Sequence, residues 1–303
     1  LLAQPLIEIA NATGADAIAH GATGKGNDQV RFELGAYALA PGIQVIAPWR
    51  EWDLNSRTVL MEFAKKHGIP VQATTESPYS IDENLFGISV ECGILEDPTT
   101  APPADAYQIT TDPKDAPNEA EVVTITFEKG IPVALNGVAK SPVELVVELN
   151  DLGSKHGVGR LDIIENRVVG IKSREIYEAP SATILHKGHH ELEKLVMDKD
   201  TYRYKQGVSN QIGNMIYDGL WFTPLFNSLM AFVDSTQEYI SGNVKIELYK
   251  GTLKVLSRDS EFSLYNEELA TYKEGDKFDH ASSIGFIHLY GLPFKTLSQV
   301  RNK

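Results

Sequence analysis

The segment from His20 to Glu33, HGATGKGNDQVRFE, carries the side chains of this sequence that are best suited to bind a small polar molecule. Asn27 and Arg31 are one helical turn apart, so on a helix they project from the same face. Thr23 adds a hydroxyl group and Asp28 a carboxylate beside them. Arginine pairs with carboxylates and aspartate with ammonium groups, so this set predicts a site for a zwitterionic amino acid.

The same loop could bind phosphate, because a glycine-rich turn before a helix directs backbone N–H groups and the positive end of the helix dipole to one point. The two standard phosphate motifs nevertheless fail. A Walker loop would need glycine at Ala19 and a hydroxyl residue at Gly26, and a dinucleotide fingerprint from Gly24 would need glycine at Gln29. The sequence therefore gives only weak support to a generic nucleotide loop.

A simpler alternative is a tight turn in which Asn27 caps the next helix and the loop glycines adopt positive φ. The glycines concerned are Gly21, Gly24 and Gly26. This alternative explains the glycines but does not explain Arg31 and the neighbouring polar groups.

Strands that alternate with helices are expected to hold this loop. Apolar spacing and glycine or proline stops predict helices at 6–12, 28–40 and 57–67 and strands at 15–20, 43–48 and 69–71. Such alternation predicts an α/β domain with a parallel, Rossmann-like sheet and right-handed crossovers. Because the chain enters on a helix, we expect this sheet to be incomplete.

The second half has the pattern of an α+β domain. We expect hairpins at 121–137 and 243–257, a capped helix at 141–157, more strand at 159–173, long helices at 191–218 and 224–240, and a short terminal helix at 290–303. The histidines of HKGHHE, residues 186–191, lack the spacing of a zinc helix and predict a solvated helix start. We therefore assign no protein metal site.

Composition excludes several classes of protein. The 303 residues carry a formal charge of -13, which argues against a broad nucleic-acid surface. The single cysteine, Cys92, excludes an internal disulfide framework, and the sequence has neither a membrane-length apolar run nor a leader pattern. We therefore expect a cytoplasmic protein that binds neither membrane nor nucleic acid.

Several long motifs, in order, resemble those of the argininosuccinate synthase family. They are HGATGKGNDQVRFEL, VIAPWREW, YSIDENLFGIS, GILEDP, GVGRLDIIENR, SREIYEAP and SLYNEEL. The resemblance covers essentially the whole chain, and it implies a carbon–nitrogen ligase that joins citrulline to aspartate with ATP, through a citrullyl-adenylate, releasing AMP and pyrophosphate. It implies an adenine nucleotide α-hydrolase-like domain at 1–76, a synthetase domain at 77–280 and an oligomerisation arm at 281–303, assembled as a homotetramer.

The resemblance also assigns ligands by position. Gly21 would contact ATP, and Mg²⁺ would arrive with the nucleotide; no side chain would act as a nucleophile. Aspartate would be held by Thr23, Asn27 and Asp28. Citrulline would be held by Asn27, Arg31, Ser80, Ser89, Glu165 and Tyr177.

Two departures from the family pattern concern function. The family's SGGLDTS-type pyrophosphate loop has no counterpart in this sequence, and its first methionine is Met61, so we expect that a segment has been removed upstream. The alternative to the ligase is therefore a truncated remnant that folds, binds amino acids weakly or oligomerises without turnover. In addition, Glu175 stands where the family has glycine, which puts the backbone around Tyr177 in question.

Overall fold

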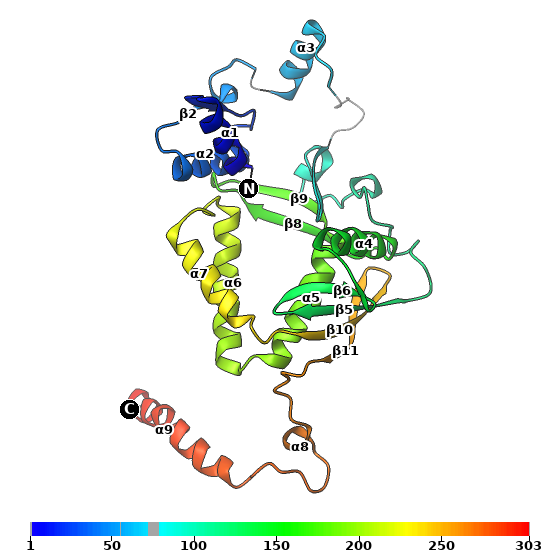
Figure 1. The fold of residues 1–303 in the computed structure, drawn as a ribbon, viewed down its shortest axis with the longest axis vertical. Coiled ribbons are helices and arrows are strands. Elements are labelled where there is room, and N and C mark those ends of the chain that lie inside the picture. The colour runs from blue at the N-terminus through cyan, green and yellow to red at the C-terminus, as the bar shows by residue number, and fades with distance from the viewer. Residues whose placement is uncertain (1, 55, 72–78, 303) are drawn as a thin grey trace. The chain divides into compact units, whose positions relative to one another are not determined.

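The computed structural model describes residues 2–54, 56–71 and 79–302, and it contains two compact units, 1–262 and 263–303. The expected boundary between residues 76 and 77 lies outside the described residues. The first part of the chain is an α/β arrangement in which β1 and β2 pair in parallel, with Ala17 opposite Gln44 (Figure 1). Its elements are α1 (Ala3–Thr13), β1 (Ala17–Ala19), α2 (Asp28–Leu39), β2 (Gln44–Ile46), the 3-10 turn η1 (Pro48–Arg50) and α3 (Arg57–His67). The predicted parallel α/β pattern is confirmed for these elements.

Ile7 and Ala10 of α1, Ile18 of β1 and Ala36 of α2 form the small core of this part. They lie at the spacing that places one face of each helix on the strands. The loop of residues 20–27 leaves the end of β1 and enters α2, so this core sets the position of the loop.

Residues 69–71, where a third strand was predicted to start, lie in no strand, so that prediction was wrong for these described residues. Helix α3 ends at Gly68, whose φ of 64 degrees lies in the left-handed region. The N–H of Ile69 then bonds the Ala64 carbonyl at 2.9 Å, as at many glycine-ended helices. Ile69 and Val71 remain about half exposed, so burial does not hold them in a sheet.

A five-stranded antiparallel sheet, in the order β11-β10-β5-β6-β7, forms the largest core together with α4 and α5. Its strands are β5 (Glu121–Glu128), β6 (Ile131–Leu135), β7 (Val138–Ala139), β10 (Gly242–Tyr249) and β11 (Thr252–Asp259), and α4 is Pro142–Lys155. The predicted hairpins are confirmed, with both residues of each tight turn, Lys129-Gly130 and Lys250-Gly251, at positive φ. Ser141 begins α4 with the expected cap, a capping box with Glu144.

A four-stranded antiparallel sheet, in the order β3-β4-β9-β8, carries most of the remaining predicted site residues. Its strands are β3 (Ser80–Asn84), β4 (Gly87–Glu91), β8 (Arg160–Asn166) and β9 (Lys172–Glu178), and the short turns η2 (Gly93–Glu96) and η3 (Ala104–Ala106) follow β4 in the chain. The strand predicted at 159–173 is thus two strands joined by a turn. Val90 and Ile176 point to one face of this sheet, where they pack with Leu95 and Ala106.

Three helices follow: α5 (Pro180–Val196), α6 (Lys199–Tyr217) and α7 (Pro224–Thr236). The prediction of one helix at 191–218 was wrong, because Met197 is extended and the Asp198 side chain caps a new helix by accepting from the N–H groups of Asp200 and Thr201. The prediction of a solvated helix start at 186–191 was also wrong. These residues lie in the middle of α5, where His189 packs on Phe127.

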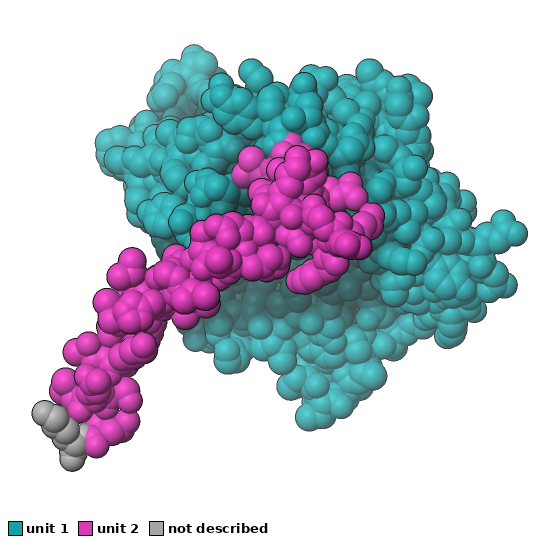
Figure 2. Space-filling model, turned by 90° about the horizontal axis from the view of Figure 1, so that it is seen from below, with its two compact units in different colours: residues 1–262 teal, residues 263–303 magenta. Residues whose placement is uncertain are grey.

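The second unit contains α8 (Glu267–Ala270) and α9 (Ser282–Arg301), and Figure 2 colours it magenta. Helix α9 is longer than the predicted terminal helix and has Pro293 inside it. None of its described residues is buried, although many are apolar. In the described part of the chain, no helix combines the length and the apolar character needed to cross a bilayer.

Candidate functional site

The glycine-rich loop is held by its backbone and by Gln29 rather than by unusual glycine geometry. The Gly26 N–H donates to the Thr23 carbonyl at 3.1 Å, and the buried Gln29 amide donates to the Gly24 carbonyl at 2.7 Å. Gly21, Gly24 and Gly26 do not have positive φ, so the prediction that they supply it was wrong. Gly21 and Thr23 are exposed on this loop and are available to a ligand.

Asn27 precedes α2 but does not cap it with its side chain. Its Nδ2 donates to the Tyr217 hydroxyl at 2.8 Å, and its Oδ1 accepts from the Val168 N–H at 2.8 Å. The capping prediction was therefore wrong, because both ends of the amide are engaged by residues far along the chain. These two bonds fix which end of the amide faces Tyr217.

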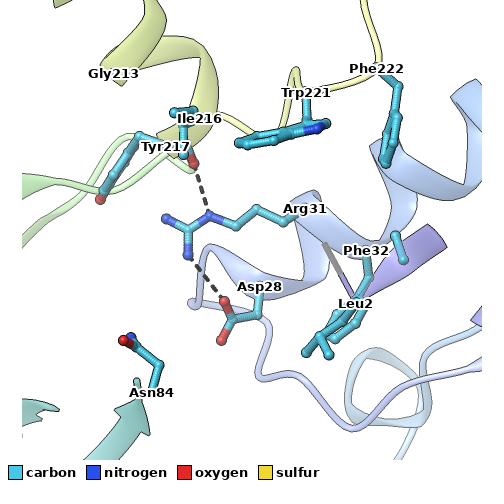
Figure 3. A pocket seen from close by; sticks show the side chains of 12 residues that line it. Leu2, Asp28, Arg31, Phe32, Asn84, Gly213, Ile216, Tyr217, Trp221 and Phe222 are labelled. Carbon is cyan, nitrogen blue, oxygen red and sulfur yellow. Dashed lines mark hydrogen bonds and ion pairs between the residues drawn. The ribbon is translucent and has the colours of Figure 1, made fainter. Parts of the chain in front are cut away.

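Arg31 reaches the same tyrosine from one turn further along α2. Its Nε donates to the Tyr217 carbonyl at 2.9 Å, and its guanidinium carbon lies 5.0 Å from the centre of the Tyr217 ring. Its Nη1 pairs with Asp28 at 3.2 Å (Figure 3). The prediction that Asn27 and Arg31 project together is confirmed, and both contact the last residue of α6.

The four predicted residues of the second sheet share one of its faces. Ser89 pairs directly with Tyr177, and Asp82 pairs with Ser89, so these side chains point the same way. Glu165 pairs with Ser173, four residues before Tyr177, and Ser80 lies two residues before Asp82; side chains two or four apart on a strand share a face. The face opposite to the one occupied by Val90 and Ile176 therefore presents Ser80, Ser89, Glu165 and Tyr177 together.

Glu165 joins this face to the loop and α2. The Tyr217 hydroxyl donates to its Oε1 at 2.6 Å, and the Tyr177 hydroxyl lies 2.9 Å from its Oε2. Burial and the Glu165 hydrogen bond raise the pKa of Tyr217 to about 12, so this phenol keeps its proton at neutral pH. The hydrogen bonds form a continuous chain from Asn27 through Tyr217 and Glu165 to Tyr177.

Sequence reasoning missed Tyr217. It lies at the end of α6, about 190 residues after Asn27, and it contacts Asn27, Arg31 and Glu165. No local pattern distinguishes it from any other tyrosine at a helix end. Only the fold could have identified it.

A pocket of about 670 Å³ opens beside Arg31 and Tyr217. One part of its wall is polar, with Asp28 and Asn84, and another is apolar, with Trp221 and Phe222 (Figure 3). The arrangement suits a ligand that has a charged end and an aliphatic portion. Among the described residues, no hydrogen bond joins Gly21 or Thr23 to the hydrogen-bonded chain. Over residues 2–54, 56–71 and 79–302, no group of three or more His, Cys, Asp or Glu is placed to hold a metal ion.

Comparison with known proteins identifies the family. Residues 1–70 match the arginosuccinate synthase N-terminal HUP domain, and residues 79–297 match the arginosuccinate synthase C-terminal domain. The chain belongs to the argininosuccinate synthase family. It is 58% identical over 301 residues to the argininosuccinate synthase of Chlorobium phaeobacteroides strain BS1, a match that covers 99% of this chain and 75% of that protein.

Two further argininosuccinate synthases, from Pelodictyon phaeoclathratiforme and Chlorobaculum tepidum, are each 57% identical over 300 residues, again covering 99% of this chain and 75% of theirs. The family consists of ligases, so the predicted enzyme class and the resemblance to argininosuccinate synthase are confirmed. The HUP match agrees with the parallel α/β pairing of β1 and β2, which confirms the predicted fold class.

Proposed function

We propose that this protein condenses citrulline with aspartate at the expense of ATP, by way of a citrullyl-adenylate. The observation that carries the proposal is the hydrogen-bonded chain of Asn27, Tyr217, Glu165 and Tyr177. It joins the loop of a HUP-type domain, which suits a nucleotide, to a polar sheet face, which suits an amino acid.

The proposed site divides its charges between the two amino acids. Arg31 offers a guanidinium to the citrulline carboxylate, and Glu165 offers a carboxylate to its ammonium group. Ser80, Ser89 and Tyr177 supply hydroxyl groups from the same sheet face. Thr23 and Asn27 of the loop and Asp28 at the start of α2 hold aspartate, and Gly21 of the loop lies against ATP.

The chemistry needs positioning more than it needs a reactive side chain. The ureido oxygen of citrulline attacks the α-phosphorus of ATP, the bond to pyrophosphate breaks, and a citrullyl-adenylate forms. The aspartate amine then attacks the activated carbon and AMP leaves with the former ureido oxygen. Holding three substrates in reach and neutralising developing charge are the contributions of the protein. Mg²⁺ would be carried by the ATP phosphates, as is usual where a protein offers no dedicated cage.

Citrulline labelled with ¹⁸O in its ureido group tests this route. If the adenylate forms, one labelled oxygen per turnover should appear in the AMP phosphate, and labelled pyrophosphate should exchange into ATP before aspartate is added. Unlabelled AMP would contradict the adenylate. Citrulline binding by calorimetry without any exchange or turnover would favour the alternative of a non-catalytic chain.

We further propose that the arm at 281–303 binds other copies of this chain, in a homotetramer. Ile284, Phe286, Ile287, Leu289 and Tyr290 of α9 are each at least 65% exposed in a single chain, and apolar helix faces of this kind are normally covered by a partner. Light scattering should give a mass near four times 33.4 kDa, and removal of 281–303 should lower it. A monomeric intact protein would contradict this assembly.

A further inference from the structure

Glu175 is a carboxylate on the polar sheet face, and the proposed reaction assigns it no role. It lies on β9 opposite Ile163 and two residues before Tyr177, so it shares the face of the predicted citrulline residues. Its side chain is only 12% exposed. Its Oε2 lies 2.8 Å from the Tyr177 hydroxyl, whose oxygen is also 2.9 Å from Oε2 of Glu165.

The hydrogen-bonded chain has too few protons for two ionised carboxylates. The Asn27 Nδ2 group is a donor to the Tyr217 oxygen, so the Tyr217 proton is directed to Glu165. Tyr177 has one proton but two carboxylate neighbours at hydrogen-bond distance. One of these two short contacts therefore needs a proton from a carboxylic acid.

Glu165 already accepts the short hydrogen bond from the Tyr217 hydroxyl at Oε1, so this oxygen carries no proton in that contact. Glu175, by contrast, has only longer contacts at Oε1. Arg167 Nη2 lies 3.5 Å from this oxygen, and the Ser173 hydroxyl lies 3.4 Å from it. Arg167 is closer to Glu91, which draws its charge away from Glu175. The extra proton consequently belongs on Glu175.

We propose that Glu175 is a positioning residue of the amino-acid site, which as a neutral carboxylic acid donates to the Tyr177 oxygen and thereby directs the Tyr177 proton to Glu165. This inference rests on the proposed function, in which Glu165 binds the citrulline ammonium. A neutral Glu175 leaves Glu165 as the anion of the pair and orients it with two phenol donors.

The charges around Glu175 support a neutral form. They are Glu165 on β8, Glu91 on β4 and Arg167 in the turn between β8 and β9, together with the Tyr177 phenol. Burial, the largest effect, raises the pKa of Glu175 together with the charges of the two carboxylates, and it outweighs the opposing effects of the Tyr177 hydrogen bond and the Arg167 charge. Since the neutral form persists below a raised pKa, citrulline affinity should be retained at low pH and fall as pH rises through the pKa of Glu175.

Two substitutions separate the proton from the charge. Glu175→Gln keeps a donor toward Tyr177 without a titratable group. Its citrulline dissociation constant should therefore stay within about twofold of the original at low pH, and its affinity should no longer fall at higher pH. Glu175→Leu removes the donor and should raise the dissociation constant about tenfold, as expected for a lost buried hydrogen bond. Calorimetry across pH measures both, and Glu83→Leu, exposed on the opposite face of the same sheet, is the matched control.

The outcomes are distinct from those that test the site itself. Equal weakening by Glu175→Gln and Glu175→Leu, or no pH difference between Glu175→Gln and the original protein, would overturn the neutral-donor role. Glu165→Gln should weaken citrulline binding; if it does not, the proposed site is wrong whatever Glu175 does. If Glu165→Gln weakens binding while Glu175→Leu leaves it unchanged, the site stands and Glu175 has no part in it. Should Glu175→Leu fail to fold, the pH comparison with Glu175→Gln still decides the proposal.

Discussion

Replacing Arg31 with leucine should weaken citrulline binding about 100-fold, the lower part of the range for losing one partner of a hydrogen-bonded charge pair. The guanidinium lines the pocket, and its side chain is 37% exposed, so it is accessible to a ligand carboxylate. Its Nε bond to the Tyr217 carbonyl and its contact with the Tyr217 ring fix its direction. Leucine keeps the aliphatic stem but removes the charge and all the donors.

Calorimetry with citrulline and with aspartate measures this effect, and the affinity for aspartate should change much less. The citrulline affinity of Arg31→Lys should lie between that of the original protein and that of Arg31→Leu, because lysine keeps the charge but cannot form bidentate contacts. Arg203→Leu, on an exposed position of α6, controls for the loss of a positive charge. Unchanged citrulline affinity in folded Arg31→Leu would remove Arg31 from the citrulline site.

Features that depend on nearby residues were predictable. The turns at Lys129-Gly130 and Lys250-Gly251 and the cap at Ser141 follow from the conformational preferences of a few adjacent residues. The common direction of Asn27 and Arg31 follows from helix geometry alone. For the same reason, the parallel α/β pattern of the first part of the chain could be recognised before its strands were seen.

Features that depend on distant partners were not predictable by periodicity. The run at 69–71 is apolar enough for a strand, but no described neighbour buries it. Asn27 has the right type and place for a helix cap, yet Tyr217 and Val168 take its side chain. The resemblance to a family supplied Glu165 and Tyr177 as site residues, whereas Tyr217, which links them to the loop, came only from the fold.

A buried ion pair between α5 and α6 determines where α6, and hence Tyr217, can lie. Lys205 Nζ is 2.7 Å from Glu193 Oε1, and the two side chains are 7% and 3% exposed. Gln237 also donates to Glu193 at 3.2 Å, and His189 Nδ1 lies 3.7 Å from it. Burial lowers the pKa of His189, so this imidazole is a poor replacement for the lysine cation.

Lys205→Met should therefore lower the free energy of unfolding by about 3 to 5 kcal/mol, the usual cost of leaving one member of a buried pair alone. The double variant Lys205→Met/Glu193→Leu should recover most of that loss, because it removes the unpaired carboxylate as well. Denaturant unfolding measures both, and Lys199→Met, an exposed change at the start of the same helix, should cost less than about 0.5 kcal/mol. If the double variant is as unstable as Lys205→Met, the lost free energy of unfolding comes from lost packing rather than from an unpaired charge. The charge pair would then not be what holds α6 in place.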